Sequence, residues 1–185
     1  MFQKYFLSSR EIDSAKLFLR IIFQTRGKML WGVFLMNSLG IFENSEGVFP
    51  ILAPALEKYG GAAFKTDFSL DGRIYPLIFC KKQRPSADFF KNRFTAVAGE
   101  KDIYLLELLK KQKIKVLTCG LCEKNSLTLS SFEAGEASVC LTRQYRKLLP
   151  CEFTVRFPDF LSAEQLLLCA AGLLLTVGYK EEFSL

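Results

Sequence analysis

The chain has 185 residues, which corresponds to about one domain and is long enough to bury a substantial core. Half of the residues are hydrophobic, 24% are charged and 18 are Phe, so the composition excludes disorder and predicts an aromatic core. The net charge of +6 favours anionic partners, and the absence of histidine excludes Ser-His-Asp and Cys-His catalysis and His-ligated zinc or haem.

The first apolar segments precede residue 43. Residues 9–23 fit either a helix with one apolar face or a strand, and the pattern leaves both open. Residues 28–42 hold Asn37 and Gly40 between apolar runs, which predicts a turn that joins two strands.

Loops and a hairpin are expected next. Residues 47–61 are rich in Gly and Pro, and residues 81–92 include KKQRPS, so both segments are predicted to be loops. Between them, residues 64–79 carry Asp71-Gly72 between apolar runs, the strongest short signal for a β-hairpin.

The second half continues mainly with strands. Residues 102–113 have leucines at helical spacing and a lysine-rich end, which predicts a short helix. Residues 127–145 alternate apolar and polar side chains on both sides of Gly135, and residues 153–157 alternate in the same way. The repeated plan of strand, turn and returning strand predicts an antiparallel meander or barrel.

The most apolar segment is residues 166–179, LLLCAAGLLLTVGY, which contains no charge. Ser162 and Gln165 have the spacing of a capping box at the start of a helix, and Gly178 marks its end. Spanning a bilayer takes about 20 apolar residues, so we expect a core helix that is surrounded by protein rather than lipid.

The order of these motifs resembles one group of families. Residues 153–179, FTVRFPDFLSAEQLLLCAAGLLLTVGY, are similar to the end of phospholipid scramblases, where an F-x-[IV]-x-F-P strand leads into a hydrophobic helix. Residues 116–148 resemble the preceding scramblase segment, with paired cysteines, two strands around a Gly turn and a basic-aromatic step. The resemblance is firmest over residues 116–179 and extends to the tubby and LURP-one families.

This resemblance implies that residues 1–185 form a single domain. Its expected fold is mainly β, a tubby/scramblase-like antiparallel β-barrel closed around a central hydrophobic α-helix. The implied function is not enzymatic: the domain binds anionic phospholipids or phosphoinositides at a membrane surface, with a scrambling ancestry. The alternative is a soluble interaction or scaffold domain that keeps the fold without lipid activity. The lack of a secretory signal favours an intracellular, cytoplasmic or peripheral-membrane location.

Basic side chains are the candidate headgroup ligands, since each Lys or Arg near an anionic surface contributes about 1 kcal/mol. The candidates are Lys81, Lys82, Arg84, Lys110, Lys111, Lys113, Lys115, Arg143, Arg146 and Lys147. Nucleic acid is a less favoured partner, because the aromatic residues are better placed in the core.

No cofactor is expected. Scramblases carry an acidic segment before the F-x-x-x-F-P strand, whereas here only Glu152 and the nearby Asp159 are acidic, a poor cage for calcium. Cys119 and Cys122 form a C-x-x-C pair, which is interpreted first as buried thiols, then as half a zinc site, then as a redox motif.

Overall fold

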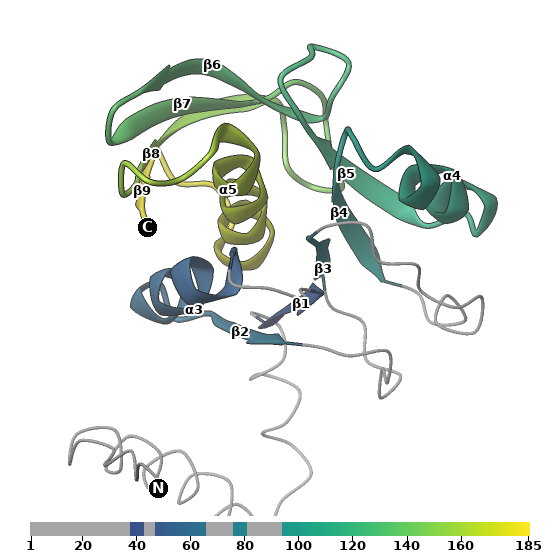
Figure 1. The fold of residues 1–185 in the computed structure, drawn as a ribbon, viewed down its shortest axis with the longest axis horizontal. Coiled ribbons are helices and arrows are strands. Elements are labelled where there is room, and N and C mark those ends of the chain that lie inside the picture. Colours follow the sequence, from purple (N-terminus) through teal and green to yellow (C-terminus); the bar gives the residue numbers. More distant parts are fainter. Residues whose placement is uncertain (1–37, 43–46, 66–75, 81–93) are drawn as a thin grey trace, which may run out of the picture. The chain divides into compact units, whose positions relative to one another are not determined.

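A nine-stranded mixed β-sheet organises the residues that the computed structural model describes, which are 38–42, 47–65, 76–80 and 94–185 (Figure 1). All of them belong to the unit Met36–Leu185. The strands in sheet order are β2 (Ala62–Lys65), β1 (Ser38–Phe42), β3 (Pro76–Phe79), β4 (Thr95–Gly99), β5 (Lys115–Cys119), β6 (Leu127–Glu133), β7 (Glu136–Leu141), β8 (Cys151–Arg156) and β9 (Glu182–Ser184).

The first five strands run parallel to one another. β1 lies between β2 and β3, and the parallel pairing continues through β4 to β5. Helix α3 (Phe49–Lys58) connects β1 to β2, and helix α4 (Ile103–Lys111) connects β4 to β5, as parallel neighbours require. This order, 2-1-3-4-5, is that of a doubly wound α/β sheet.

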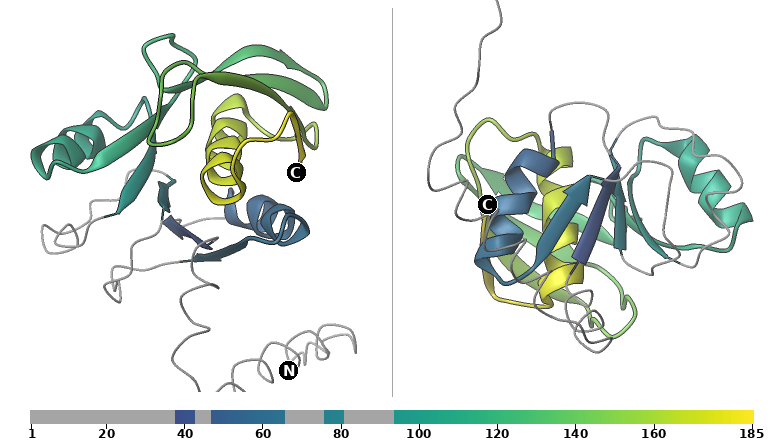
Figure 2. Two further views of the ribbon diagram at one scale, coloured as in Figure 1. Left: turned by 180° about the vertical axis from the view of Figure 1, so that it is seen from behind. Right: turned by 90° about the horizontal axis from the view of Figure 1, so that it is seen from below.

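Helices cover both faces of this parallel part, and Figure 2 shows α3 and the C-terminal helix α5 (Ala163–Val177) on one side and α4 on the other. Successive strand residues supply the two cores. Ile41 and Ile78 pack with α3 and α5, whereas the neighbouring Phe42 and Phe79 pack with α4. Strands buried on both faces lose the alternation of apolar and polar residues, and all five residues of β1 and of β4 are indeed buried.

The last strands are mainly antiparallel and lie over α5 (Figure 1). β6 and β7 form a hairpin whose turn contains Gly135 at a φ of 79°, and β8 pairs antiparallel with β7 and parallel with β9. Helix α5 packs against α3 and strands from both halves of the sheet. The Ser162 hydroxyl accepts the Gln165 N–H, and the Gln165 side chain accepts the Ser162 N–H, so the helix begins with the predicted capping box.

Several sequence predictions are confirmed. The chain is mainly β with a C-terminal helix, the hairpin around Gly135 forms, and β8 overlaps the strand predicted at residues 153–157 but ends at Arg156. The helix predicted at residues 102–113 is α4, with the Asp102 side chain accepting the Leu105 N–H at 3.2 Å. No described helix has the length and hydropathy needed to cross a membrane.

The antiparallel meander predicted for the first half is wrong. Gly40 lies inside β1 rather than in a turn, and residues 64–79 do not form a hairpin, because β1 separates β2 from β3 and runs parallel to both. Asp71-Gly72 and Asn37 lie outside the described residues, as do residues 9–23 and 81–92. Over the described residues the sheet order runs from β2 to β9 without closing.

The loop predicted at residues 47–61 is also wrong, because it contains α3. Pro50 lies in the first turn of the helix, where its missing N–H costs nothing, and Gly60 follows the helix at a φ of 77°. Pro50 and Gly60 therefore mark the two ends of this helix, while Pro54 lies inside it.

Candidate functional site

Strands β4 and β5 present a different candidate site at each end. They are parallel and in register, so Thr95 and Lys115 lie at one end and Gly99 and Cys119 at the other. The amino ends adjoin predicted basic residues, and the carboxyl ends border a pocket that the sequence did not predict.

We call the exposed cations at the end of α4 and in the turn between β7 and β8 the basic surface; they are Lys110, Lys111, Lys113, Arg146 and Lys147. Its first part is the end of α4. The Ile114 N–H donates to the Leu109 carbonyl and the Lys113 N–H donates to the Lys110 carbonyl, each at 3.0 Å, which is the hydrogen-bond pattern of a Schellman cap. Lys113 has a φ of 54°, at the position where such caps usually hold glycine. Lys110 and Lys111 lie in the last helical turn, and all three side chains are exposed.

The second part is a tight turn between β7 and β8. Tyr145 and Leu148 exchange two backbone hydrogen bonds of 3.0 Å, which leaves Arg146 and Lys147 exposed at the tip, with Arg146 at a φ of 55°. The Tyr145 ring is buried, and its hydroxyl donates to the Lys115 carbonyl at 3.4 Å. Burial raises the pKa of Tyr145. The turn is therefore anchored to the first residue of β5.

The structure thus joins some of the predicted basic residues. Lys115 and the Arg146–Lys147 tip are linked through Tyr145, whereas Arg143 turns to the β5–β6 connection and donates to the Lys124 carbonyl. Lys81, Lys82 and Arg84 lie outside the described residues.

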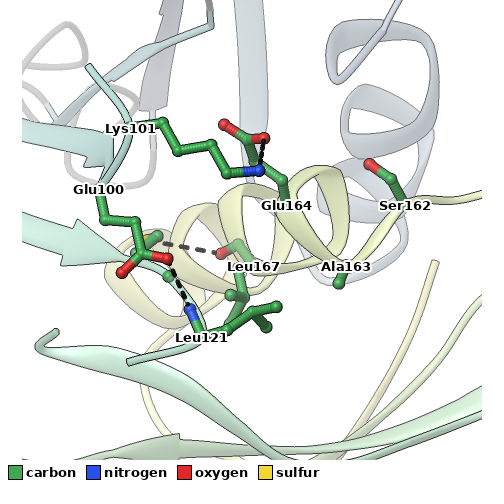
Figure 3. A pocket seen from close by; sticks show the side chains of 9 residues that line it. Glu100, Lys101, Leu121, Ser162, Ala163, Glu164 and Leu167 are labelled. Atoms are coloured by element: carbon green, nitrogen blue, oxygen red, sulfur yellow. Dashed lines mark hydrogen bonds and ion pairs between the residues drawn. The ribbon is translucent and has the colours of Figure 1, made fainter. Parts of the chain in front are cut away.

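A pocket of about 210 Å³ lies at the carboxyl ends of β4 and β5, beside the first turn of α5 (Figure 3). Its lining residues come from three segments: Glu100 and Lys101; Cys119, Gly120 and Leu121; and Ser162, Ala163, Glu164 and Leu167.

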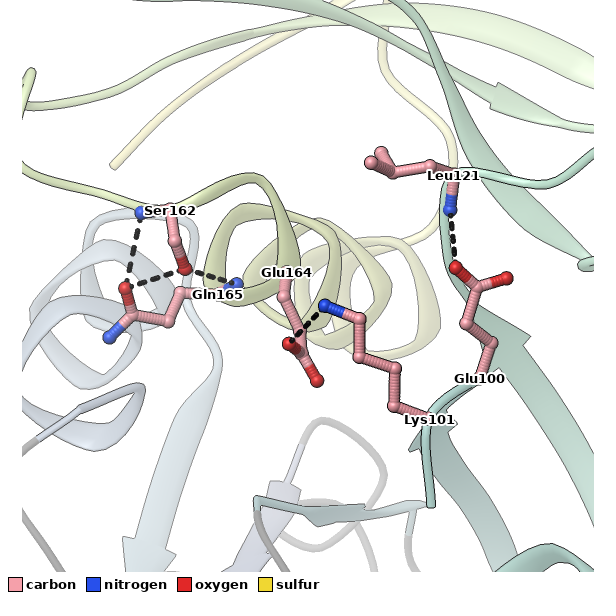
Figure 4. A network of polar contacts seen from close by, with 6 residues as sticks. All are labelled: Glu100, Lys101, Leu121, Ser162, Glu164 and Gln165. Atoms are coloured by element: carbon pink, nitrogen blue, oxygen red, sulfur yellow. Dashed lines mark hydrogen bonds and ion pairs between the residues drawn. The ribbon is translucent and has the colours of Figure 1, made fainter. Parts of the chain in front are cut away.

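Glu100 is held in place by the β5–β6 connection. Its carboxylate accepts the Leu121 N–H at 3.1 Å and the side-chain amide of the buried Asn125, and Figure 4 shows the first of these bonds. A Cβ at Gly120 would lie 2.2 Å from the Glu100 carboxyl carbon, so glycine is required for this packing.

Glu164 is less constrained. It faces Lys101 with a nitrogen-oxygen separation of 3.8 Å, and both side chains are at least half exposed, so this ion pair contributes little to stability (Figure 4).

Cys119 lies beside this pocket and Cys122 does not share its environment. The Cys119 thiol is buried and donates to the Leu167 carbonyl at 3.8 Å, and burial raises its pKa far above the ordinary value. Burial therefore favours the protonated thiol, which is the weaker nucleophile and the weaker metal ligand. Cys122 is exposed, so the interpretation as a pair of buried thiols holds for Cys119 alone.

The two acidic residues of the degenerate calcium segment are not brought together. Glu152 lies on β8 with an exposed side chain, which accepts a hydrogen bond from Ser130 of β6. Asp159 lies beyond the end of β8, near Gly135. At about 3.3 Å per strand residue, the stretch from Glu152 to the end of β8 alone spans roughly 13 Å. Within the described ranges, no group of three or more His, Cys, Asp or Glu is placed to hold a metal ion.

Comparison of the chain with models of known protein families and with curated proteins gave no match. The pocket residues were missed because the strand before Glu100, TAVAG, is buried on both faces and has no alternation. A usable signal was present: an apolar run, then the helix at 102–113, then a second apolar run at 115–119 is typical of a β-α-β unit.

Proposed function

We propose that this domain binds a small polar ligand in the pocket at the carboxyl ends of β4 and β5. The observation that carries the proposal is the position of the pocket. In doubly wound α/β sheets, ligands bind outside the carboxyl ends of parallel strands, most often where the strand order reverses, which here is between β1 and β3. The pocket shares the carboxyl end of the sheet with that position but lies at the neighbouring strands β4 and β5. The parallel order 2-1-3-4-5, with helices on both faces, supports the same conclusion.

The pocket favours a ligand that donates hydrogen bonds. Glu100 is a fixed carboxylate acceptor, and no salt bridge joins it to another residue of the described ranges. Glu164 adds a second acceptor, which forms an exposed ion pair with Lys101. Pockets for whole drug-sized ligands span about 300–1,000 Å³, so a pocket of about 210 Å³ receives one ring or one amino group of a ligand.

Nucleosides provide a matched test of this chemistry, because cytidine carries an exocyclic amine where uridine carries a carbonyl. We expect millimolar cytidine or adenosine to raise the thermal midpoint of the full chain, and uridine, whose base offers one ring N–H in place of an amino group, to raise it less. Glu100→Gln should abolish the shift, because it replaces one carboxylate acceptor by a donor while keeping the shape of the side chain. Equal effects of cytidine and uridine, or no effect of any of the three, would contradict the proposal.

A second function, binding to an anionic membrane surface, is favoured by the basic residues at the other end of the strands. Lys113 and Arg146 are the non-glycine residues with positive φ in the described part of the chain, and both are cations. A left-handed backbone costs about 1–2 kcal/mol for a residue with a Cβ. The long basic side chains at these two positions therefore oppose local backbone preference, as is typical of functional positions.

Flotation with vesicles tests this second function. We expect binding to vesicles of phosphatidylcholine with 30% phosphatidylserine, weakened by physiological salt, and none to phosphatidylcholine alone. The triple variant Lys110→Glu, Lys111→Glu, Lys113→Glu should abolish binding. The double variant Lys101→Glu, Lys124→Glu serves as a charge-reversal control at the opposite, carboxyl ends of β4 and β5, and it should still bind. Absence of binding at low salt leaves the soluble interaction domain as the remaining reading of the basic surface.

Membership of the tubby and scramblase superfamily, with a non-enzymatic role in an intracellular, cytoplasmic or peripheral-membrane location, also stays a proposal, although the five parallel strands depart from the antiparallel barrel that it implies. A closed barrel requires the edge strands β2 and β9 to join, directly or through further strands. An experimental structure of the whole chain tests this, and an open sheet there would overturn the proposed membership.

A further inference from the structure

The turn between β7 and β8 carries an exposed apolar residue directly beside its cations. Leu149 is 67% exposed, and it follows the Arg146–Lys147 tip by two residues. The preceding Leu148 packs partly against the core, so the two leucines have opposite surroundings.

The backbone that presents Leu149 is held firmly. Tyr145 and Leu148 exchange two backbone hydrogen bonds, and the buried Tyr145 ring ties the turn to β5 through the Lys115 carbonyl. A membrane-facing side chain on such a turn loses little conformational freedom on binding, because the turn is already ordered.

We propose that Leu149 inserts into the acyl region of an anionic bilayer while Arg146 and Lys147 contact its headgroups. The inference rests on the second proposed function, binding to an anionic membrane. The charge of the turn selects the partner: cations next to an exposed apolar side chain match the two layers of a bilayer interface, a negative headgroup region over hydrocarbon. A free phosphate or a soluble inositol phosphate offers no apolar layer for Leu149.

The other exposed large hydrophobic residues of the described ranges differ in setting: Ile103 and Tyr179 also have a lysine within two residues, whereas Phe160 and Leu121 have none. Phe160 is 76% exposed but follows Asp159, and Leu121 is 65% exposed but borders the pocket at the opposite end of the strands. Phe160 therefore provides a control of similar exposure without flanking cations.

Vesicle affinity separates insertion from charge attraction. On vesicles with 30% phosphatidylserine at physiological salt, we expect Leu149→Ala to weaken binding by about tenfold or more, the effect of removing a large apolar side chain from hydrocarbon. Phe160→Ala should bind as the unchanged protein does. The loss of vesicle affinity caused by Leu149→Ala should be the same at high salt, because insertion of an apolar side chain is not screened. The loss caused by Arg146→Glu should disappear at high salt, because salt screens the attraction between charges.

Insertion depth is read directly in a Trp31→Phe, Leu149→Trp variant. Its fluorescence should shift to the blue and be quenched by brominated acyl chains in anionic vesicles. Binding of the protein without quenching, together with normal binding of Leu149→Ala, would show that the membrane function stands and the insertion is wrong. No binding of the unchanged protein to anionic vesicles would overturn both.

Discussion

Single glycines decide how close the pocket segments can approach one another. Gly120 lies against the Glu100 carboxylate and Asn125, and an added Cβ would come within 2.5 Å of both side chains. A Cβ added at Gly99 would meet a Glu164 carboxylate oxygen at 3.0 Å. This contact is easier to relieve, because the Glu164 side chain is partly exposed and can move away. A side chain at Gly120 would therefore have to displace a fixed carboxylate, whereas one at Gly99 would displace a carboxylate that can move.

Gly120→Ala is expected to lower the free energy of unfolding by about 1–3 kcal/mol, because the fixed Glu100 carboxylate must be displaced. Urea denaturation measures this change. Gly99→Ala, the control, should cost clearly less.

A double-mutant cycle identifies the cause. In a Glu100→Ala background the added methyl group at Gly120 loses its closest neighbour, although the Asn125 amide remains near, so the cost of Gly120→Ala should shrink. An unchanged cost in that background would place the strain elsewhere.

Titratable groups in the core predict sensitivity to alkali. Burial raises the pKa values of Cys119 and Tyr145, so the folded chain keeps protons that the unfolded chain releases. The resulting stabilisation is fully present below the unfolded pKa of about 8.5 for Cys and is lost as the pH rises further. We expect the urea midpoint to fall between pH 8 and pH 10, and Cys119→Ala to reduce that fall. A midpoint independent of pH over this range would argue against a buried thiol at this position.

At the scale of elements, α5 depends on a close crossing with its neighbours. An added Cβ at Gly172 would lie 2.6 Å from a methyl group of Leu52 in α3 and 2.9 Å from one of Leu39 in β1. Glycine thus lets α5 pack against both elements at once.

Gly172→Ala should destabilise the protein by about 1–3 kcal/mol although alanine favours helices, because the core has no space for the methyl group. Thermal unfolding followed by circular dichroism checks this. The Gly172→Ala, Leu52→Ala double variant should be less destabilised than the sum of the two single variants. Strict additivity would mean that the helices separate rather than clash.

Elements with local signals were predictable from the sequence. The capping box at Ser162 and Gln165, the turn at Gly135 and the alternation in β8 each depend on neighbours in the chain, and all are confirmed. β1 and β4 carry no such signal, because strands buried on both faces lose their alternation. The partner of a strand also lies far away in the sequence, so the parallel pairing of β1 with β2 and β3 could not be deduced from hairpin turns.

The candidate sites were likewise predictable from the sequence only where a local pattern marks them. Lys113 and Arg146 were nominated from composition, but their left-handed backbones and the link through Tyr145 come only from the folded chain. The pocket brings together residues near 100, 120 and 164, a combination that no local pattern contains.

At the scale of the whole molecule, the parallel strands give the described unit a chemical direction. Cations adjoin the amino ends of β4 and β5, whereas the two carboxylates Glu100 and Glu164 and one cation, Lys101, border their carboxyl ends. A ligand in the pocket and a membrane at the turn would therefore occupy opposite ends of the same strands, and both could be bound at once.

The central place of α5 also governs the order in which this chain can fold. Leu39, Ile41 and Leu52 share a core with α5, more than a hundred residues later in the sequence. During synthesis their apolar face has no cover until the ribosome has released that helix, so the early strands must wait in an exposed, aggregation-prone form. Contacts of such long sequence separation also slow folding. We therefore expect the nascent chain to depend on chaperones until α5 has left the ribosome.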